Sequence, residues 1–152
     1  MAVKAAVLSD THGLLRPEVL ETITGCDVII HGGDINKQEV LDKLQQIAPV
    51  YAVRGNNDKE WAEQIPKTLT ISIEDCQIFV VHNKKDVPKD LGDADAVIFG
   101  HSHKYFEQTI GGRLWLNPGS CGKRRFDQEI TFAMMTVEGK EIEVEKIEIQ
   151  HV

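Results

Sequence analysis

The sequence has few cysteines and no paired cysteine motif. Its 152 residues include three cysteines, Cys26, Cys76 and Cys121, and none of them belongs to a Cys-x-x-Cys pair. An odd, widely spaced set argues against a disulfide framework and against a zinc site built from thiolates. We therefore expect Cys26 and Cys76 to pack as small apolar side chains.

The chain also lacks a long apolar run and an excess of positive charge. No stretch approaches the roughly 20 apolar residues that span a bilayer, and the first residues enter a strand pattern without the layout of a secretory signal. We therefore expect no membrane partner and a cytoplasmic location. The formal net charge of −7 argues against long nucleic acid as a partner. An acidic protein that binds a phosphate needs local positive charge, which bound cations can supply.

Apolar patterning predicts a single α/β domain over residues 1–152. In the first half, strand patterns at 3–8, 27–30 and 50–53 alternate with helical spacing over 16–24 and 37–48, an order that favours a parallel sheet. The second half is a series of strands, several of them in antiparallel pairs, at 68–73, 77–81, 96–99, 105–110, 113–116, 131–137 and 141–149. We expect a mixed arrangement in two sheets packed face to face. The last strand is an expected edge, which leaves a homo-oligomer open.

Polar side chains follow five of the predicted strands at the point where each strand ends. The five clusters are Ser9-Asp10-Thr11-His12, Gly32-Gly33-Asp34, Gly55-Asn56-Asn57-Asp58, His82 and Gly100-His101-Ser102-His103. Ligands of one site are expected in loops at the carboxyl ends of strands in such sheets. Carboxylates, imidazoles and one amide oxygen without a thiolate suit Mn, Fe, Zn, Ni or Co better than calcium. A carboxylate such as Asp34 can bridge two ions held roughly 3.5–4 Å apart.

The ordered series Asp10-x-His12, Gly33-Asp34, Gly55-Asn56-x-Asp58, His82 and Gly100-His101-x-His103 resembles the calcineurin-like metallophosphoesterases. The short length, the early Asn56 loop and the later Asn117-Pro118-Gly119-Ser120 segment are most similar to the small bacterial and archaeal phosphodiesterase branch. The resemblance covers nearly the whole chain. Each motif alone is weak, whereas the ordered set of five is specific. The fold that it implies is an α/β four-layer αββα sandwich, two mixed β-sheets flanked by helices.

The resemblance also implies a metal centre with seven ligands. One divalent ion would be bound by Asp10, His12, Asp34 and His103, and a second by Asp34, Asn56, His82 and His101. We expect Mn²⁺, with Ni²⁺, Fe²⁺, Zn²⁺ and Co²⁺ as alternatives. The implied reaction is hydrolysis of a small phosphodiester by a hydroxide that bridges the two metals.

Asn57 and Asp58 are the candidate catalytic residues beside these ligands. The larger phosphatases of the superfamily carry at position 57 a histidine that assists the leaving group, whereas Asn57 cannot donate a proton at useful acidity. We therefore expect a preference for activated esters or diesters. Asp58 either orients a ligand histidine as a hydrogen-bond acceptor or caps its own loop.

Arg54, Asn117 and Gly119 are the candidate substrate-binding residues. Arg54 lies beside the Asn56 loop, although a structural ion pair would explain it equally well, and Asn117 and Gly119 are expected to shape the floor of the site. The basic run Lys123-Arg124-Arg125 either anchors a phosphate or is a solvated loop. We expect a structural hydrogen bond for His31 and a solvated side chain for His151.

Two other functions compete with a phosphodiesterase. A scaffold subunit of the retromer coat keeps this fold as a protein-interaction platform and has lost ligand positions, whereas all seven expected ligands are present here. A nuclease acting on short nucleotides is the third reading. The segment 84–94 is short for a full helix and predicts one or two turns, which would leave the site more open on that side.

Overall fold

The computed structural model describes residues 2–123 and 128–149. Its first sheet contains three parallel strands, β1 (Val3–Leu8), β2 (Val28–His31) and β3 (Val50–Ala52). It is completed by β9 (Ile130–Glu138), which pairs antiparallel with β1, and β10 (Glu141–Ile149), which pairs antiparallel with β9. The strand order is β10-β9-β1-β2-β3, so β10 forms one edge. The buried run of β1 suits this place because a central strand is covered on both faces.

The second sheet is built from the middle of the chain. It contains β4 (Thr68–Ile73), β5 (Cys76–Val81), β6 (Ala96–Ile98), β7 (Phe106–Ile110) and β8 (Arg113–Asn117) in the order β4-β5-β6-β8-β7. β5, β6 and β8 run parallel, while β4 and β7 pair with their neighbours in antiparallel fashion. The turn between β7 and β8 is Gly111-Gly112, and both glycines have positive φ, as a tight hairpin requires.

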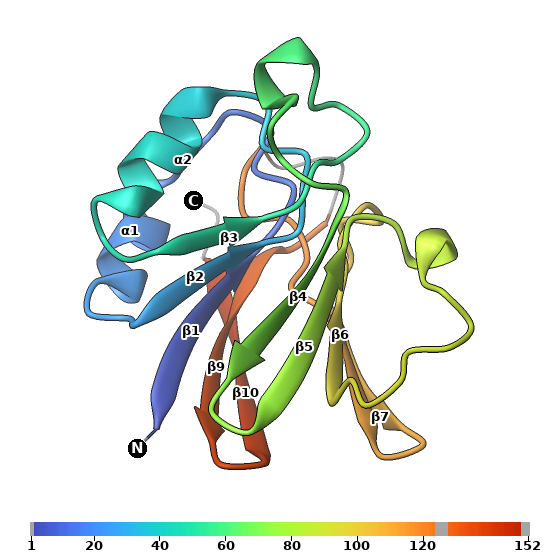
Figure 1. Ribbon diagram of the computed structural model, residues 1–152. Helices are drawn as coiled ribbons and strands as arrows, with labels where there is room; N and C mark the ends of the chain where they lie inside the picture. The colour runs from blue at the N-terminus through green and yellow to red at the C-terminus, as the bar shows by residue number, and fades with distance from the viewer. Residues whose placement is uncertain (1, 124–127, 150–152) are drawn as a thin grey trace.

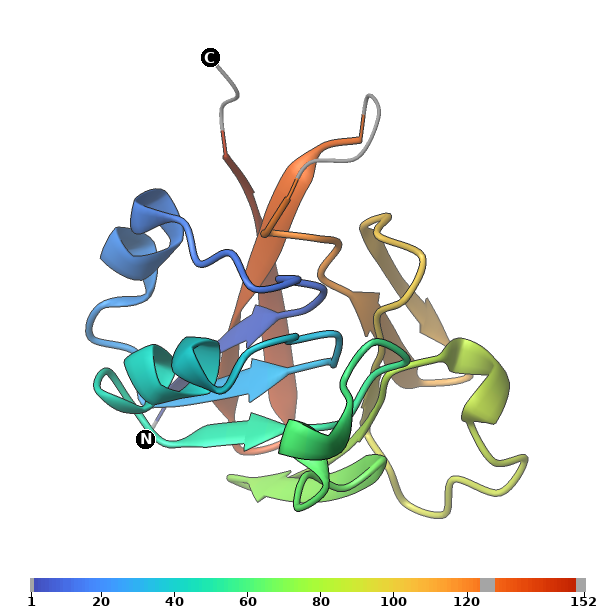
Figure 2. The same cartoon turned by 90° about the horizontal axis from the view of Figure 1, so that it is seen from above.

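Two helices cover the outer face of the first sheet (Figure 2). These are α1 (Pro17–Ile23) and α2 (Gln38–Gln45). The proline opens α1 because the first turn needs no N–H donor there. The predicted helix over 37–48 is too long at its end: the N–H groups of Ile47 and Ala48 both donate to the carbonyl of Leu44, so the chain tightens into a turn after Gln45.

The main core lies between the two sheets. Val7 and Ile30 from the first sheet pack with Ile78 and Ile98 from the second, and none of the four has measurable exposure. A second apolar cluster fills the space between the first sheet and its helices. Burial of such side chains stabilises a fold by about 1.5–3 kcal/mol each, so the sheets form a rigid base for the loops at their ends.

The outer face of the second sheet is covered by little helical structure. The turn η2 (Lys84–Asp86) and the chain that follows it lie over Phe99, Phe106 and Trp115, and the ammonium of Lys84 lies 5.3–5.8 Å from the three ring centres. A second short turn, η1 (Glu60–Ala62), follows β3. The predicted α/β sandwich of two mixed sheets is confirmed, and the 84–94 segment forms one short turn, as expected from its length.

The loops after β2, β3 and β5 gather at one end of the molecule, the upper end in Figure 1. Apart from η2 and one other short turn, the described residues contain only α1 and α2 as helices, and neither is long and apolar enough to cross a membrane.

Candidate metal centre

Backbone hydrogen bonds tie the loops at this end to one another. The N–H of Asp10 donates to the carbonyl of Gly33 at 2.9 Å, and the N–H of His12 donates to the carbonyl of Asp34 at 3.0 Å. The loop after β6 is joined in the same way, because the N–H of Gly100 donates to the carbonyl of His82 at 2.8 Å. These bonds join the loops in two pairs, one from each sheet, and the hydrogen bond between His82 and the carbonyl of Gly32 connects the pairs.

One group of buried side chains consists of Asp10, His12 and His103, whose ligand atoms all lie within 4.8 Å of one another. The Nε2 atoms of His12 and His103 are 3.2 Å apart. Oδ1 of Asp10 lies 3.4 Å from Nε2 of His103 and 3.7 Å from Nε2 of His12. These three side chains belong to the first ligand set expected from the sequence.

A second group shares Asp10 and adds Asp34 and His82. Oδ2 of Asp34 lies 3.2 Å from Nε2 of His82 and 3.8 Å from Nε2 of His12. Nδ1 of His82 donates to the carbonyl of Gly32 at 2.7 Å, which leaves Nε2 turned toward the carboxylates. This second hydrogen bond is the usual way in which a protein orients a metal-binding histidine.

The chemistry of the two groups fits divalent cations. Among the described residues, buried polar atoms without a hydrogen-bond partner are Oδ1 of Asn36 and, within these two groups, Oδ1 of Asp10 and Nε2 of His82. Buried polar atoms are nearly always satisfied, so two of them facing each other favour a bound cation here. Carboxylate oxygens and imidazole nitrogens without a thiolate suit a transition-metal ion such as manganese, iron, nickel or zinc.

The folded protein favours the charged forms of the side chains at this site. Burial opposes ionisation of Asp10, but the nearby imidazoles of His103 and His12 outweigh it and hold the pKa of this carboxyl far below its usual range. Burial also disfavours the charged form of His82, yet the close approach of the Asp34 carboxylate and the charge of Asp10 raise the pKa of the imidazole. Asp34 is likewise ionised, since its pKa is lowered against burial by His82 and by the N–H of Asn57.

His101 and Asn56 lie beside the second group rather than inside it. The His101 ring meets the His82 ring edge-on, with centres 5.3 Å apart, and its backbone N–H donates to Oδ2 of Asp10 at 3.0 Å. Both His101 and Asn56 are exposed. Asn56 lines one hollow together with His82. Five of the seven expected ligands are therefore buried together, and His101 and Asn56 lie at the rim.

The backbone is strained at most of these ligands. Seven described residues other than glycine have positive φ, and five of them are expected ligands: Asp10 (53°), His12 (48°), Asp34 (56°), His101 (75°) and His103 (65°). The left-handed region costs an ordinary residue about 1–2 kcal/mol. Such strain gathers at functional sites, where the surrounding structure enforces it.

Asp58 holds two of the loops through backbone N–H groups. Its Oδ1 accepts from Ile35 at 2.9 Å and from Asn36 at 2.7 Å, and its Oδ2 accepts from Gly55 at 2.9 Å. The carboxylate is buried between the loops after β2 and β3. The Asp58 carboxylate therefore joins the loop that carries Asp34 to the loop that carries Asn56.

Asn57 supports Asp34 directly. Its N–H donates to Oδ1 of Asp34 at 2.8 Å, and its side-chain amide lies 3.4 Å from Oδ2.

Asn117 and Gly119 underlie the loop that carries His101 and His103. Nδ2 of Asn117 donates to the carbonyl of Gly100 and to Oγ of Ser102, both at 3.1 Å, and its Oδ1 accepts from the N–H of Gly119. Asn117 is fully buried. Gly119 has φ of 78°, and a Cβ there would overlap Oγ1 of Thr131. Their contacts shape the loop from below.

His31 has the structural hydrogen bonds expected of it. Its Nδ1 accepts from the N–H of Gly33 at 3.1 Å, which leaves Nε2 to donate to Oγ1 of Thr11 at 3.0 Å. Complete burial lowers its pKa to about 4, so the ring is neutral. Cys26 and Cys76 are buried and free, as expected, and so is Cys121.

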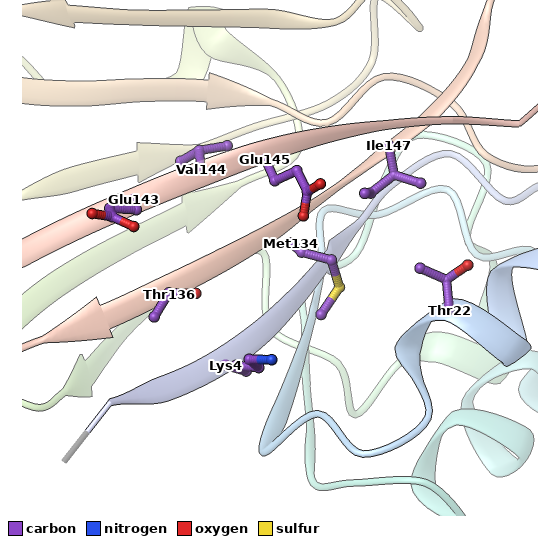
Figure 3. Close-up of a pocket in the computed structure, with 8 residues that line it drawn as sticks. All are labelled: Lys4, Thr22, Met134, Thr136, Glu143, Val144, Glu145 and Ile147. Carbon is purple, nitrogen blue, oxygen red and sulfur yellow. The ribbon is translucent and has the colours of Figure 1, made fainter.

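Two hollows of similar size lie in the surface. One, about 360 Å³, lies over the outer face of β1, β9 and β10 and is lined by Lys4, Met134, Glu143 and Glu145 among others (Figure 3). None of the expected ligands lines it. The other, about 400 Å³, is lined by Arg54, Asn56, Lys67, His82 and neighbouring residues, so it opens onto the second group of ligands.

Some residues of the site carry little signal in the sequence. Oγ of Ser9 donates to Oδ2 of Asp10 at 2.7 Å, and Oγ of Ser120 donates to the carbonyl of Asp10 at 2.9 Å. Ser9 could have been predicted because it directly precedes Asp10. No sequence pattern relates Lys67 to Arg54. Lys123 is exposed, while Arg124, Arg125 and His151 lie outside the described residues.

Known proteins match both the sequence and the fold. The model of the calcineurin-like phosphoesterase superfamily domain matches residues 3–140. A probable metallophosphoesterase of Methanothermobacter thermautotrophicus is 28% identical over 93% of this chain and 90% of its own length. A protein of Methanocaldococcus jannaschii named a phosphodiesterase is also 28% identical, over 78% of this chain and 84% of its own.

Two solved structures share the architecture. Vacuolar protein sorting 29 from Cryptosporidium parvum has a TM-score of 0.79 at 20% identity and covers 99% of both chains. An archaeal phosphodiesterase has a TM-score of 0.79 at 23% identity and covers 97% of this chain and 100% of its own. At such identities the likeness shows a common fold.

Proposed function

Because the chain belongs to the calcineurin-like phosphoesterase superfamily, we propose that it is a phosphodiesterase that hydrolyses small phosphodiesters with two divalent cations, Mn²⁺ first among them. The family supports hydrolysis of a phosphoester bond in general. The relative from Methanocaldococcus jannaschii that is named a phosphodiesterase supports the narrower activity.

The observation that carries the proposal is the surroundings of Oδ1 of Asp10. This buried atom has no hydrogen-bond partner among the described residues, and the Nε2 atoms of His12, His82 and His103 lie 3.7, 4.0 and 3.4 Å from it. One carboxylate oxygen and three imidazole nitrogens around one point form a donor set for a transition-metal cation.

The ligands divide between two neighbouring positions. Asp10, His12 and His103 would hold one cation, and Asp34, His82, Asn56 and His101 would hold the other. The resemblance makes Asp34 the shared carboxylate, and Asp10 also borders both groups in the structure. When bound, two such cations stabilise the charge that develops on the phosphoryl oxygens and lower the pKa of a water molecule between them.

The residues beside the candidate ligands determine which esters should react fastest. Asn57 donates to Asp34 through its N–H and orients that ligand. An amide cannot protonate a departing alcohol, so position 57 gives no acid catalysis. Esters whose leaving group departs as a stable anion should therefore react fastest. Arg54, which lines the hollow beside His82, is the residue that we assign to contact with the substrate.

A protein-interaction scaffold is the second candidate function. The fold shared with vacuolar protein sorting 29 favours it. The buried orphan atoms of Asp10 and His82 argue for the enzyme, because a scaffold without metals would leave two polar atoms unsatisfied in its interior at a cost of about 1–3 kcal/mol each.

The test is hydrolysis of bis-p-nitrophenyl phosphate, followed by the absorbance of the released p-nitrophenolate. We expect no activity after chelation, recovery on addition of Mn²⁺, and loss of about 100-fold or more in His82→Ala. Asp42→Asn on the exposed side of α2 is the control and should retain full activity. A Mn²⁺-loaded protein that cleaves neither mono- nor diesters, and in which His82→Ala changes nothing, would refute the enzyme.

A further inference from the structure

The hollow beside the second ligand group brings two cationic side chains to one place. Arg54 follows β3 and Lys67 precedes β4, and the N–H of Arg54 donates to the carbonyl of Pro66 at 2.8 Å. This bond fixes the end of one sheet against the start of the other. Thr68 pairs with Val81 at the end of the β4–β5 ladder, which gives the hollow a rigid wall.

Neither the Arg54 nor the Lys67 side chain forms a hydrogen bond or an ion pair with a described residue. Arg16 and Arg113, the other two arginines of that part of the chain, donate from their guanidinium groups to backbone carbonyls, whereas Arg54 makes no such bond there. Lys67 likewise forms no ion pair with a described residue, in contrast to Lys140 and Lys146. What sets these two cations apart is that both line one hollow beside the candidate metal ligands.

Neutral donors complete the hollow. Oδ1 of Asn83 accepts from the N–H of Lys85, so the N–H groups of the Asn83 amide remain for a ligand. Thr68 adds a hydroxyl at the rim. Asp86 is the one carboxylate among the lining residues, which leaves a formal charge of +1 from Arg54, Lys67 and Asp86. The volume of about 400 Å³ lies in the range of small-molecule sites, roughly 300–1,000 Å³.

From this arrangement we propose that the hollow binds a second phosphate group of the substrate, carried on the alcohol arm that extends from the ester bond at the metal centre. The inference rests on the proposed function, since it assumes that the ester bond lies at that centre.

His82 and Asn56 belong to both the ligand set and the lining of the hollow, so one molecule can reach both. The guanidinium fork of Arg54 and the ammonium of Lys67 match the oxygens of a phosphate. The preferred substrates are therefore phosphodiesters with a further phosphate on one arm.

The test compares two substrates that differ by one group, thymidine 5′-(p-nitrophenyl phosphate) with and without a 3′-phosphate. We expect kcat/KM to be about 10-fold or more higher with the 3′-phosphate. Arg54→Gln and Lys67→Gln should each reduce that ratio toward one. Lys59→Gln, an exposed cation just after Asp58 that does not line the hollow, should leave the ratio within about twofold.

A binding measurement separates this inference from the proposed function. By calorimetry on the Mn²⁺-loaded protein, thymidine 3′,5′-bisphosphate should bind about 10-fold or more tightly than thymidine 5′-monophosphate, and Arg54→Gln should remove the difference. If no diester is cleaved but this difference is found, the phosphodiesterase fails and the phosphate site stands. If diesters are cleaved without preference and the bisphosphate binds no tighter, or if Lys59→Gln acts like Arg54→Gln, the phosphate site is refuted.

Discussion

Replacement of Asp58 by alanine would remove three hydrogen bonds that join the two loops carrying the candidate ligands Asp34 and Asn56. The carboxylate accepts from the N–H groups of Ile35, Asn36 and Gly55 at 2.7–2.9 Å. Ile35 is fully buried, so its N–H would lose its acceptor without gaining water, whereas Asn36 and Gly55 are half-buried and can be partly rehydrated. The loss should therefore be large but less than three full charged hydrogen bonds.

Hydrogen bonds to a charged group contribute about 1.5–3 kcal/mol each. With rehydration of two of the three donors, we expect Asp58→Ala to lower the free energy of unfolding by about 3–5 kcal/mol. Asp58→Asn keeps an acceptor for Ile35 and Asn36 but turns an NH₂ group toward the N–H of Gly55, for a loss of about 2–3 kcal/mol. For a domain of this size, the melting temperature should fall by about 2–4 °C per kcal/mol.

The assay is urea unfolding in chelating buffer, followed by the fluorescence of Trp61 and Trp115, together with calorimetric titration of Mn²⁺. We expect both Asp58 variants to bind Mn²⁺ about 10–100-fold more weakly, because loops that orient ligands are loosened. Asp42→Ala, which removes an acceptor of one exposed side-chain hydrogen bond from Gln38, should cost less than about 0.5 kcal/mol. If Asp58→Ala lowers the free energy of unfolding by less than about 1 kcal/mol, the Asp58 carboxylate does not hold these loops together.

Three further predictions concern pH, metal and packing. The pKa of His31 is about 4 in the folded protein and 6.5 in the unfolded chain, so on acidification the unfolded chain takes up the proton first. The free energy of unfolding should therefore fall by about 3 kcal/mol between pH 6.5 and 4. Urea unfolding at several pH values should show a shallower fall for His31→Gln, and an equal slope would contradict this prediction. Mn²⁺ at 100 times its Kd should stabilise the metal-free protein by about 2.7 kcal/mol, a rise of about 5–11 °C in a thermal melt, and His82→Asn should abolish most of that rise. Gly55→Ala places a Cβ against the backbone and carboxylate of Asp34 and should cost more than about 2 kcal/mol in urea unfolding, whereas Gly25→Ala, with positive φ but open space, should cost about 1 kcal/mol.

Much of the fold was predictable because burial leaves a simple pattern. Apolar runs such as residues 3–8 and 96–99 became central strands, and the alternating segment 68–73 became β4. Most predicted ends agree with the structure to within one residue. The exception is α2, whose last turn depends on how Ile47 and Ala48 reach the carbonyl of Leu44, a detail without a signature in composition.

That the candidate metal ligands gather in one place was predictable, because they follow strands whose carboxyl ends meet. The residues around them were not, since their contacts cross between loops that are distant in the sequence. Asp58 accepts from N–H groups at positions 35 and 36, and a backbone bond from Arg54 to Pro66 brings Lys67 near Arg54. The left-handed backbone at Asp10 and His12 is also a product of the folded loops, because nothing in those residue types requires it.

The positive φ angles at five of the candidate ligands bear on what happens to the fold when such a residue is replaced. Glycine relaxes the backbone at such positions, and asparagine tolerates them better than most residues. A chain that no longer needs metals can therefore gain stability by giving up ligands in favour of these residues, provided that buried partners are replaced as well. At each such position, the relief of about 1–2 kcal/mol of backbone strain would offset part of what the loss of the ligand costs.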